Sequence, residues 1–314
     1  MPSTVSVVIC AYTQDRWDDI VAAARSIRAQ DTAALETIIV VDHNPALLER
    51  VQAEFADVTV VENVESRGLS GARNSGVAIT RGEVVAFLDD DAWAESDWLT
   101  CLLDAYREPR VIGVGGQINP AWQRARPRWW PHEFDWVVGC SYRGLPDRRA
   151  EVRNMIGANM SFRRSVLAMT GPFSHGIGRV GTRPLGGEET ELAIRARRHS
   201  GGRILHEPRA RVHHRVPASR ATRRYFINRC YAEGLSKAAI SRLVGADSAL
   251  ATERTYAIRT LGSGVFRHAG DALRRGDGHG LLRAVWIVIG LAATTAGYIV
   301  GRTTARAITG SGDR

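Results

Sequence analysis

The first 110 residues alternate between short apolar runs and segments with the spacing of amphipathic helices. The apolar runs are typical of strands buried on both faces of a sheet; they lie at Val5–Ala11, 36–42, 58–62 and 83–88. Helical spacing fills the intervals, at 18–30, 45–55 and 71–79. Strands that alternate with helices predict βαβ units, so we expect an α/β fold with a mostly parallel sheet and flanking helices.

The pattern becomes less regular after residue 110. We expect further strands at 111–118, 156–162, 203–207 and 210–216, and helices from Arg163, over Glu188–Ser200 and over 219–244. A Gly/Pro-rich stretch at 172–187 is typical of a loop. The segment 120–136 is dense in Pro, Arg and Trp, and it suits either core packing or contact with a sugar or lipid.

Composition places the chain among ordinary globular proteins. It has 314 residues, 44% of them hydrophobic and 24% charged, which excludes a disordered chain or a small disulfide scaffold. The four cysteines are scattered without a CxxC pair, so we expect a reducing compartment and no cysteine zinc site. The N-terminus runs into an apolar strand without a basic segment, so we expect no secretory signal.

The positive charge is concentrated in the last third of the chain. Residues 1–202 carry 23 basic and 26 acidic side chains, a net charge of −3. Residues 203–314 carry 19 basic and 7 acidic side chains, a net charge of +12. This asymmetry predicts an anionic partner for the last third, which is a membrane surface, a nucleic acid or a phosphorylated ligand.

The run Phe87-Leu88-Asp89-Asp90-Asp91 is the strongest chemical signal. A buried strand that opens into three carboxylates concentrates negative charge, and such a cluster needs a cation. Hard divalent ions such as Mg²⁺ or Mn²⁺ suit these oxygen ligands and commonly hold substrate phosphates as well. The alternative is an acidic loop in which Asp91 caps a short helix.

A segment of small residues at 66–76 includes Arg67 and Arg73. Its backbone, with the N-terminus of the following helix, could hold a diphosphate. It has neither a P-loop lysine nor the GxGxxG spacing, and tight packing of a helix on the sheet explains it equally well.

Two later clusters are also candidates. Gly186-Gly187-Glu188-Glu189-Thr190-Glu191 could deliver a carboxylate as a general base, or could place acid at a helix N-terminus for its dipole. The pair His213-His214 at a strand end could give one imidazole to a metal or be structural.

Together and in this order, these segments resemble the inverting glycosyltransferases of family 2, which have the GT-A fold. The resemblance covers about residues 4–240, and within the family it extends to glucosyl-dolichyl-phosphate glucuronosyltransferases. The matching segments are VSVVICAYTQDR from Val5, Asp42, ARNSG at 72–76, FLDDD at 87–91, GANMSFRR at 157–164, GGEETEL at 186–192 and VHHRVP at 212–217. The resemblance implies a nucleotide-sugar-binding half at 1–110, an acceptor-binding half at 111–217 and a basic helical extension at 218–314.

The resemblance assigns donor-site roles to matching positions. Ala11, Tyr12 and Arg16 would line the nucleotide pocket, Asp42 would hold the base, which we expect to be uracil, and Arg73 would lie near the base or the diphosphate.

It also assigns residues to the sugar diphosphate and the reaction. Asp89 would touch the ribose, Asp90 would belong to the same donor site, and Asp91 and His214 would bind the metal. Glu189 matches the usual catalytic Asp of the family, although Glu188 is an adjacent alternative.

The implied activity is metal-dependent transfer of a hexosyl or uronosyl group from a nucleoside-diphosphate sugar, expected to be a UDP-sugar. The acceptor is a hydroxyl of a glycan or lipid-linked glycan, attacked in a single displacement with Glu189 as the base and Mg²⁺ or Mn²⁺ on the departing diphosphate. Alternatives are a polyprenyl-phosphate acceptor, a sugar nucleotidyltransferase, and an inactive scaffold that binds nucleotide-sugar or membrane. We expect no nucleic-acid partner, because no recognised binding motif is present.

The last uncharged stretch, residues 284–301, bears on localisation. As a helix it would be about 27 Å long, barely the thickness of a hydrocarbon core, with Trp286 and Tyr298 near its ends. It could span a membrane, lie in its plane, or be a buried helix of a soluble protein. With the basic last third, it predicts membrane contact at the cytoplasmic face of the plasma membrane, peripheral or single-pass.

Overall fold

The structure is a computed structural model that describes residues 4–175, 177–178, 186–245 and 256–309. The chain forms two compact units. The first contains Met1–Asn119, Pro146–Arg183 and Glu188–Arg215, and the second contains Pro120–Leu145, Pro184–Gly187 and Val216–Arg314.

The first unit is built on a nine-stranded sheet with the order β3-β2-β1-β4-β8-β6-β9-β5, in which β7 also pairs with β9. The strands are β1 (Val5–Ala11), β2 (Glu36–Val41), β3 (Thr59–Glu62), β4 (Val84–Asp89), β5 (Ala92–Ala94), β6 (Val111–Trp122), β7 (Ala150–Val152), β8 (Asn159–Arg163) and β9 (Arg203–Val216). The four strands of the N-terminal βαβ units pair in parallel, as predicted, and β8 joins β4 in antiparallel.

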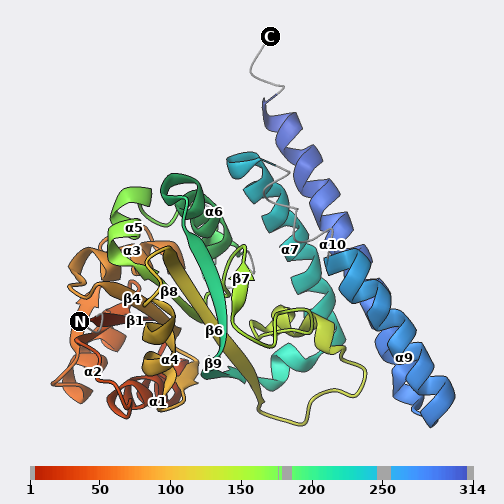
Figure 1. Cartoon of the computed structure of the whole chain (residues 1–314), viewed down its shortest axis with the longest axis horizontal. Helices are drawn as coiled ribbons and strands as arrows, with labels where there is room; N and C mark the ends of the chain where they lie inside the picture. Colours follow the sequence, from red (N-terminus) through yellow and green to blue (C-terminus); the bar gives the residue numbers. More distant parts are fainter. Residues whose placement is uncertain (1–3, 176, 179–185, 246–255, 310–314) are drawn as a thin grey trace. The chain divides into compact units, whose positions relative to one another are not determined.

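Helices cover both faces of the sheet (Figure 1). They are α1 (Trp17–Arg28), α2 (Pro45–Glu54), α3 (Leu69–Ile79), α4 (Trp98–Ala105), α5 (Arg164–Thr170) and α6 (Glu188–Ser200). One hydrophobic core joins alternate residues of the central strands, such as Val8 and Phe87, to side chains of α3, α5 and α6. The single helical turn η1 (Gln14–Arg16) follows β1 and leads into α1. The predicted α/β fold with a mostly parallel sheet and flanking helices is confirmed.

Some predicted boundaries were wrong. The two strands expected at 203–207 and 210–216 form one strand, β9, because the backbone stays extended through Pro208 although Pro interrupts the apolar pattern. The residues after Asp91 form strand β5 instead of a short helix. Helix α4 was not predicted, and the loop expected at 172–187 lies partly outside the described residues.

The second unit is largely helical. It contains η2 (His132–Val138), η3 (Ala218–Ala221), α7 (Arg223–Val244), η4 (Tyr256–Leu261), α9 (Gly262–Arg275) and α10 (Gly278–Thr309). Five aromatic rings pack on one another in its core with centroid separations of 4.5–5.7 Å; they belong to Trp129, Trp130, Phe134, Phe226 and Trp286. The Trp-rich segment therefore supplies core side chains in this unit.

Candidate active site

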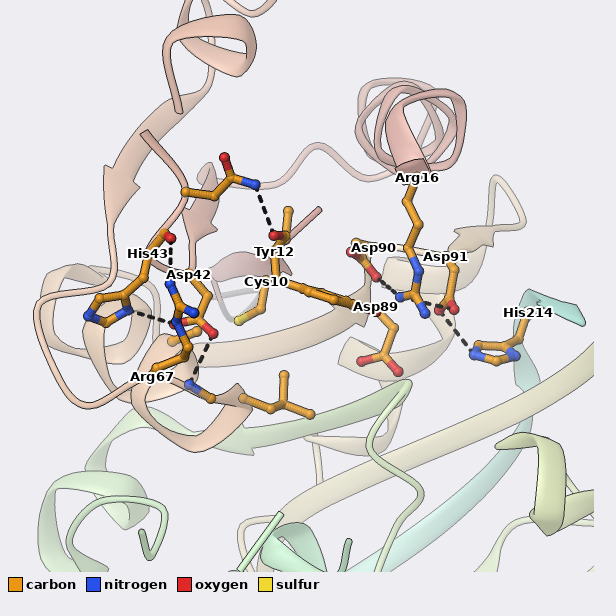
Figure 2. A pocket seen from close by; sticks show the side chains of 15 residues that line it. Cys10, Tyr12, Arg16, Asp42, His43, Arg67, Asp89, Asp90, Asp91 and His214 are labelled. Carbon is orange, nitrogen blue, oxygen red and sulfur yellow. Dashed lines mark hydrogen bonds and ion pairs between the residues drawn. The ribbon is translucent and has the colours of Figure 1, made fainter. Parts of the chain in front are cut away.

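A cavity of about 300 Å³ lies beyond the carboxyl ends of β1, β2 and β4. Ligands of open α/β sheets bind at this edge. The cavity is lined by Cys10, Ala11, Tyr12, Arg16, Asp42, His43, Asn44, Arg67, Gly68, Leu69, Ala72, Asp89, Asp90, Asp91 and His214. Figure 2 shows two polar groups in it, with Asp42, His43 and Arg67 in one and Arg16, Asp90, Asp91 and His214 in the other.

Asp42, one residue beyond β2, is held in a fixed orientation at one end of the cavity. Its Oδ1 accepts a hydrogen bond of 2.7 Å from Asn63 Nδ2, and its Oδ2 accepts one of 3.0 Å from the backbone N–H of Gly68. Gly68 has a φ of 131°, which a side chain would disfavour, so glycine is needed where the backbone meets this carboxylate. His43 Nδ1 lies 2.9 Å from Asp42 Oδ1. The arrangement offers a fixed polar edge to a planar ligand.

The other end of the cavity is acidic and contains one arginine. Nη1 of Arg16 lies 2.5 Å from Asp90 Oδ1 and 3.1 Å from Asp91 Oδ2, so a single guanidinium binds two carboxylates. Burial, together with the charges of Asp91 and Asp89, raises the pKa of Asp90 to about 7 despite Arg16. The same carboxylates raise the pKa of Arg16 although burial opposes this. The site is therefore a place of concentrated negative charge that favours cations.

The pairing register of β9 brings His214 to the acidic end of the cavity. His214 pairs with Ala92 of β5, and the N–H of Arg215 donates to the carbonyl of Asp91 over 2.8 Å. His214 Nε2 then lies 3.0 Å from Asp91 Oδ1. Because side chains alternate along a strand, His213 points the other way and stacks on Trp93 with ring centroids 5.3 Å apart. Of the two histidines, His214 alone lines the cavity.

Asp89, Asp91 and His214 fit a divalent metal. Each offers one ligand atom, and these atoms lie within 4.8 Å of one another. Two carboxylate oxygens and an imidazole nitrogen suit Mg²⁺ or Mn²⁺. The buried Oδ2 of Asp90 accepts no hydrogen bond from the described part of the protein. This oxygen beside the three residues can therefore still accept a hydrogen bond.

The small-residue segment at 66–76 serves packing as well as the cavity. A Cβ on Gly76 would lie 2.6 Å from Val8 Cγ1 and 3.1 Å from Val40 Cγ2, so glycine lets α3 lie directly on the sheet. The beginning of α3 faces the cavity through Gly68, Leu69 and Ala72. The segment thus packs α3 on the sheet at Gly76 and lines the cavity at its earlier residues.

Arg73 of α3 is buried and links the acidic strand end to α6. Its Nη1 lies 2.7 Å from Glu188 Oε1, and its Nη2 lies 3.5 Å from Asp89 Oδ1. Although burial lowers the pKa of Arg73, the charges of Glu188, Asp89 and Glu189 raise it. Arg73 does not line the cavity itself, but it contacts a residue that does.

The three glutamates at the start of α6 have different surroundings. Glu188 is buried and paired with Arg73. Glu191 is buried and bound by Arg195, with 2.7 Å between Oε1 and Nε. Glu189 is half-buried and close enough to Arg73 to affect its pKa. Glu189 lies outside the residues that line the cavity.

The structure brings together eight of the ten residues to which the family resemblance assigned a role: Ala11, Tyr12, Arg16, Asp42, Asp89, Asp90, Asp91 and His214 line one cavity, as does Arg67. Sequence reasoning missed His43, Asn44 and Cys10, which line the same cavity. His43 and Asn44 directly follow Asp42, so their position after a strand end was an available signal. Burial raises the pKa of Cys10 to about 12, so its thiol stays protonated.

Comparison with known proteins identifies the family. Residues 6–170 match the glycosyl transferase family 2 domain. The chain belongs to glycosyltransferase family 2. Over 237 residues it is 38% identical to a glucosyl-dolichyl phosphate glucuronosyltransferase of Haloferax volcanii, covering 74% of this chain and 76% of that protein. It is 26% identical over 237 residues to the succinoglycan biosynthesis protein ExoM of Rhizobium meliloti, covering 73% and 72%. This chain is therefore a glycosyltransferase.

Solved structures share its fold. The mannosyltransferase PcManGT of Pyrobaculum calidifontis, solved with GDP-Man and Mn²⁺, aligns with a TM-score of 0.58 at 16% identity, covering 94% of this chain and 87% of that chain. GalNAc-T7, solved with UDP, GalNAc and Mn²⁺, aligns with a TM-score of 0.52 at 20% identity, covering 68% and 43%. The expected GT-A fold of this glycosyltransferase is confirmed.

Proposed function

We propose that this family 2 glycosyltransferase moves a hexosyl or uronosyl group from a nucleoside-diphosphate sugar, a UDP-sugar, to a hydroxyl group of a lipid-linked glycan. The observation that carries this proposal is the cavity beyond β1, β2 and β4, in which Asp42 lies at one end and the Asp89, Asp91 and His214 group at the other. A nucleotide has a planar base at one end and a diphosphate at the other, and these two ends match the two polar groups.

The donor residues have separate roles in this proposal. Asp42, fixed by Asn63 and Gly68, accepts a hydrogen bond from the N–H of the base. Ala11 and Tyr12 form the wall of the nucleotide pocket, and Arg16 orders the acidic group. Asp89 and Asp90 lie at the end of β4, where the ribose and the start of the diphosphate would bind.

Mg²⁺ or Mn²⁺ fits the group formed by Asp91, His214 and Asp89. When bound, the ion would neutralise the negative charge that grows on the departing diphosphate. Two structural neighbours of the chain were solved with Mn²⁺, which supports this assignment. Arg73, buried between Asp89 and α6, adds a fixed positive charge near the same position.

We assign the general base to Glu189. A base must accept the proton of the acceptor hydroxyl while the oxygen attacks the anomeric carbon from the side opposite the diphosphate. The carboxylates of Glu188 and Glu191 are each bound by an arginine inside the protein, which lowers their availability for this role. Glu189 is half-buried, and it is the position that matches the usual catalytic Asp of the family. The proposed single displacement requires no covalent sugar–enzyme intermediate.

The acceptor assignment rests on the Haloferax volcanii relative, whose name gives glucosyl-dolichyl phosphate as its substrate. A sugar on a lipid carrier offers hydroxyl groups, which need a base, whereas a bare polyprenyl phosphate is already ionised. The lipid carrier would also require contact with a membrane, at the cytoplasmic face where nucleotide-sugars occur. The basic last third of the chain and α10 supply a surface for this contact.

Thermal unfolding with a panel of donors tests the proposal. A ligand that binds the folded state raises the unfolding temperature by mass action. We expect a rise with UDP-sugars in the presence of Mn²⁺ and little change with GDP- or dTDP-sugars. A rise with GDP-sugars alone would reject the uridine assignment, and no rise with any nucleotide-sugar would reject the donor site.

A further inference from the structure

Helix α10 is long and apolar enough to cross a membrane over Gly278–Thr303, yet only 28% of its 18-residue apolar window is buried. A core helix of a soluble protein would be mostly buried. The helix therefore presents an apolar surface that the second unit does not cover.

The exposed side of α10 is a continuous stripe, which we call the outer stripe. Its members follow the three- and four-residue spacing of one helix face: Leu281, Val285, Val288, Ala292, Thr295 and Ile299. The side chains of Leu281, Val288 and Ile299 are 60%, 57% and 56% exposed. The stripe extends over nearly the full length of the apolar segment.

The opposite side of α10 is built into the second unit along the same length. Ala284 and Ile287 are buried, and a Cβ on Gly290 would meet the ring of Phe134. Further on, Gly297 lies against the backbone of Tyr231, and Gly234 of α7 lies against Thr294. Figure 1 shows α7 and α10 side by side. These close approaches fix α10 to α7.

Helix α7 cannot accompany α10 across a bilayer at low cost. Beside the apolar part of α10 it carries Arg229, Glu233 and Lys237. Nη1 of Arg229 lies 3.0 Å from Oε2 of Glu233, and Nζ of Lys237 lies 3.2 Å from its Oε1. Arg242 donates to the carbonyl of Gly301 over 3.0 Å. Charged side chains are among the most unfavourable groups at the centre of a bilayer. The paired helices are amphipathic as a unit, with the outer stripe as their apolar face.

Cations lie near both ends of the outer stripe. Arg274 is exposed just before α10 begins, and Arg302 is exposed after the stripe ends. An orientation across the membrane would place one of these ends on the far side, against the positive-inside tendency. An orientation along the surface places both ends among the anionic headgroups of one leaflet.

We propose that α10 binds the surface of an anionic lipid bilayer in-plane through the outer stripe, with α7 behind it, and does not span the membrane. This mode of contact rests on the membrane association proposed above. The occupant of the stripe is lipid, because the last third of the chain, to which α10 belongs, is strongly basic, with a net charge of +12 over residues 203–314.

The first test is flotation of the full-length protein with vesicles. We expect binding to phosphatidylcholine vesicles that contain phosphatidylglycerol, weaker binding to phosphatidylcholine alone, and loss of binding as salt rises. The double variant V285E/V288E should lower the partition coefficient at least about tenfold, since it puts two charges on the stripe. The control L243E alters an exposed residue of α7 outside the stripe and should bind as the parent does.

The second test distinguishes in-plane binding from spanning. R274C and T303C are labelled with a membrane-impermeant maleimide on intact vesicles to which the protein was added from outside. The parent chain is the blank, since its cysteines are buried or, at Cys10, half-buried. In-plane binding predicts that both variants are labelled without detergent. Labelling of T303C only after detergent would show a spanning helix and overturn the proposal.

Two other results would also overturn it. One is a parent protein that does not bind either kind of vesicle. The other is a parent protein that is dimeric without detergent while V285E/V288E is monomeric. That result would make a second copy of the chain the occupant of the stripe. Circular dichroism and UDP binding by the same variants show whether they are folded. UDP binding without vesicle binding would refute membrane contact and leave the proposed donor site unaffected. Vesicle binding without UDP binding would refute the donor site and leave membrane contact unaffected.

Discussion

At the scale of single residues, the site depends on carboxylates that differ in their partners rather than in their chemistry. Asp42 accepts two hydrogen bonds that fix its orientation, Asp90 and Asp91 share Arg16, and Glu188 is held by Arg73. Bound carboxylates act as positioned acceptors or counter-charges. Asp91 combines both situations, because it pairs with Arg16 and His214 and also offers an oxygen to the proposed metal site.

The assignment of Glu189 as the base gives a prediction at this scale. Glu189→Gln keeps the volume of the side chain and removes its basicity, so kcat should fall by about 10²–10⁴ while UDP-sugar binding is kept. Initial rates with a lipid-linked sugar acceptor and calorimetric binding of donor measure the two effects.

The matched control is Glu191→Gln, on the same helix. Glu191 is bound by Arg195, so this variant should lower thermal stability and change kcat much less. A Glu189→Gln enzyme with near-normal turnover would reject Glu189 as the base and favour an acceptor that is already ionised, such as a polyprenyl phosphate.

The sequence predicted much of the site for a physical reason. Asp42 and Asp89–Asp91 follow parallel strands, and the carboxyl ends of such strands meet at one edge of the sheet. His214 lies more than 120 positions further on, and only the register of β9 with β5 brings it to Asp91. The pairing of Arg73 with Glu188 also joins residues 115 positions apart. Local periodicity carries no information on such pairings, so the sequence suggested roles for these residues but did not show which of them would meet.

At the scale of elements, close glycine contacts and ion pairs hold helices and strands of the first unit together. Helix α3 lies on the sheet at Gly76, and Arg149 links β9 to α4 through Glu207 and Asp104. The strand boundaries that sequence analysis misjudged occur where hydrogen bonding continues past a residue that interrupts the apolar pattern, as at Pro208 in β9.

Gly76→Ala tests the close contact of α3 with the sheet. The added Cβ would lie 2.6 Å from Val8 Cγ1, so overpacking should destabilise the protein by about 1–3 kcal/mol, although alanine favours helices. Gly270→Ala on α9 is the matched control, because nothing lies within 4 Å of its Cβ, and it should be neutral or stabilising. Denaturant unfolding measures both, and equal effects of the two variants would contradict the packing argument.

Glu207 of β9 predicts the acid sensitivity of the first unit. Although burial opposes it, hydrogen bonds from Arg209 and Arg149 lower the pKa of Glu207 to about 2. A carboxyl whose pKa is depressed on folding stabilises the protein above its unfolded pKa, near 4.5, and loses this contribution as pH falls toward 2. The free energy of unfolding should therefore decrease over this window.

Glu207→Gln should be less stable than the parent at pH 7, and the difference should shrink as pH falls from about 5 to 2. Urea unfolding at a series of pH values measures this. The conservative change Glu83→Gln, at an exposed residue, is the control and should leave the pH profile unchanged. A constant difference between Glu207→Gln and the parent across the window would contradict the assignment.

At the scale of the whole molecule, the chain joins a family 2 glycosyltransferase fold to a helical unit with a basic, apolar surface. The first unit contains every residue that lines the cavity beyond β1, β2 and β4, and the second contains α10 and its outer stripe. The α/β fold followed from the alternation of strands and helices. The grouping of 120–145 with the C-terminal helices did not, since it depends on aromatic contacts between segments far apart in sequence.

The central claim is that Asp91 holds a metal that the donor needs for binding. Calorimetric titration of UDP into the protein with and without Mn²⁺, in the parent and in Asp91→Ala, tests it most directly. The account predicts Mn²⁺-dependent binding of UDP to the parent and no Mn²⁺-dependent binding to Asp91→Ala, with both proteins folded by circular dichroism. Unchanged Mn²⁺-dependent binding of UDP to Asp91→Ala would contradict it.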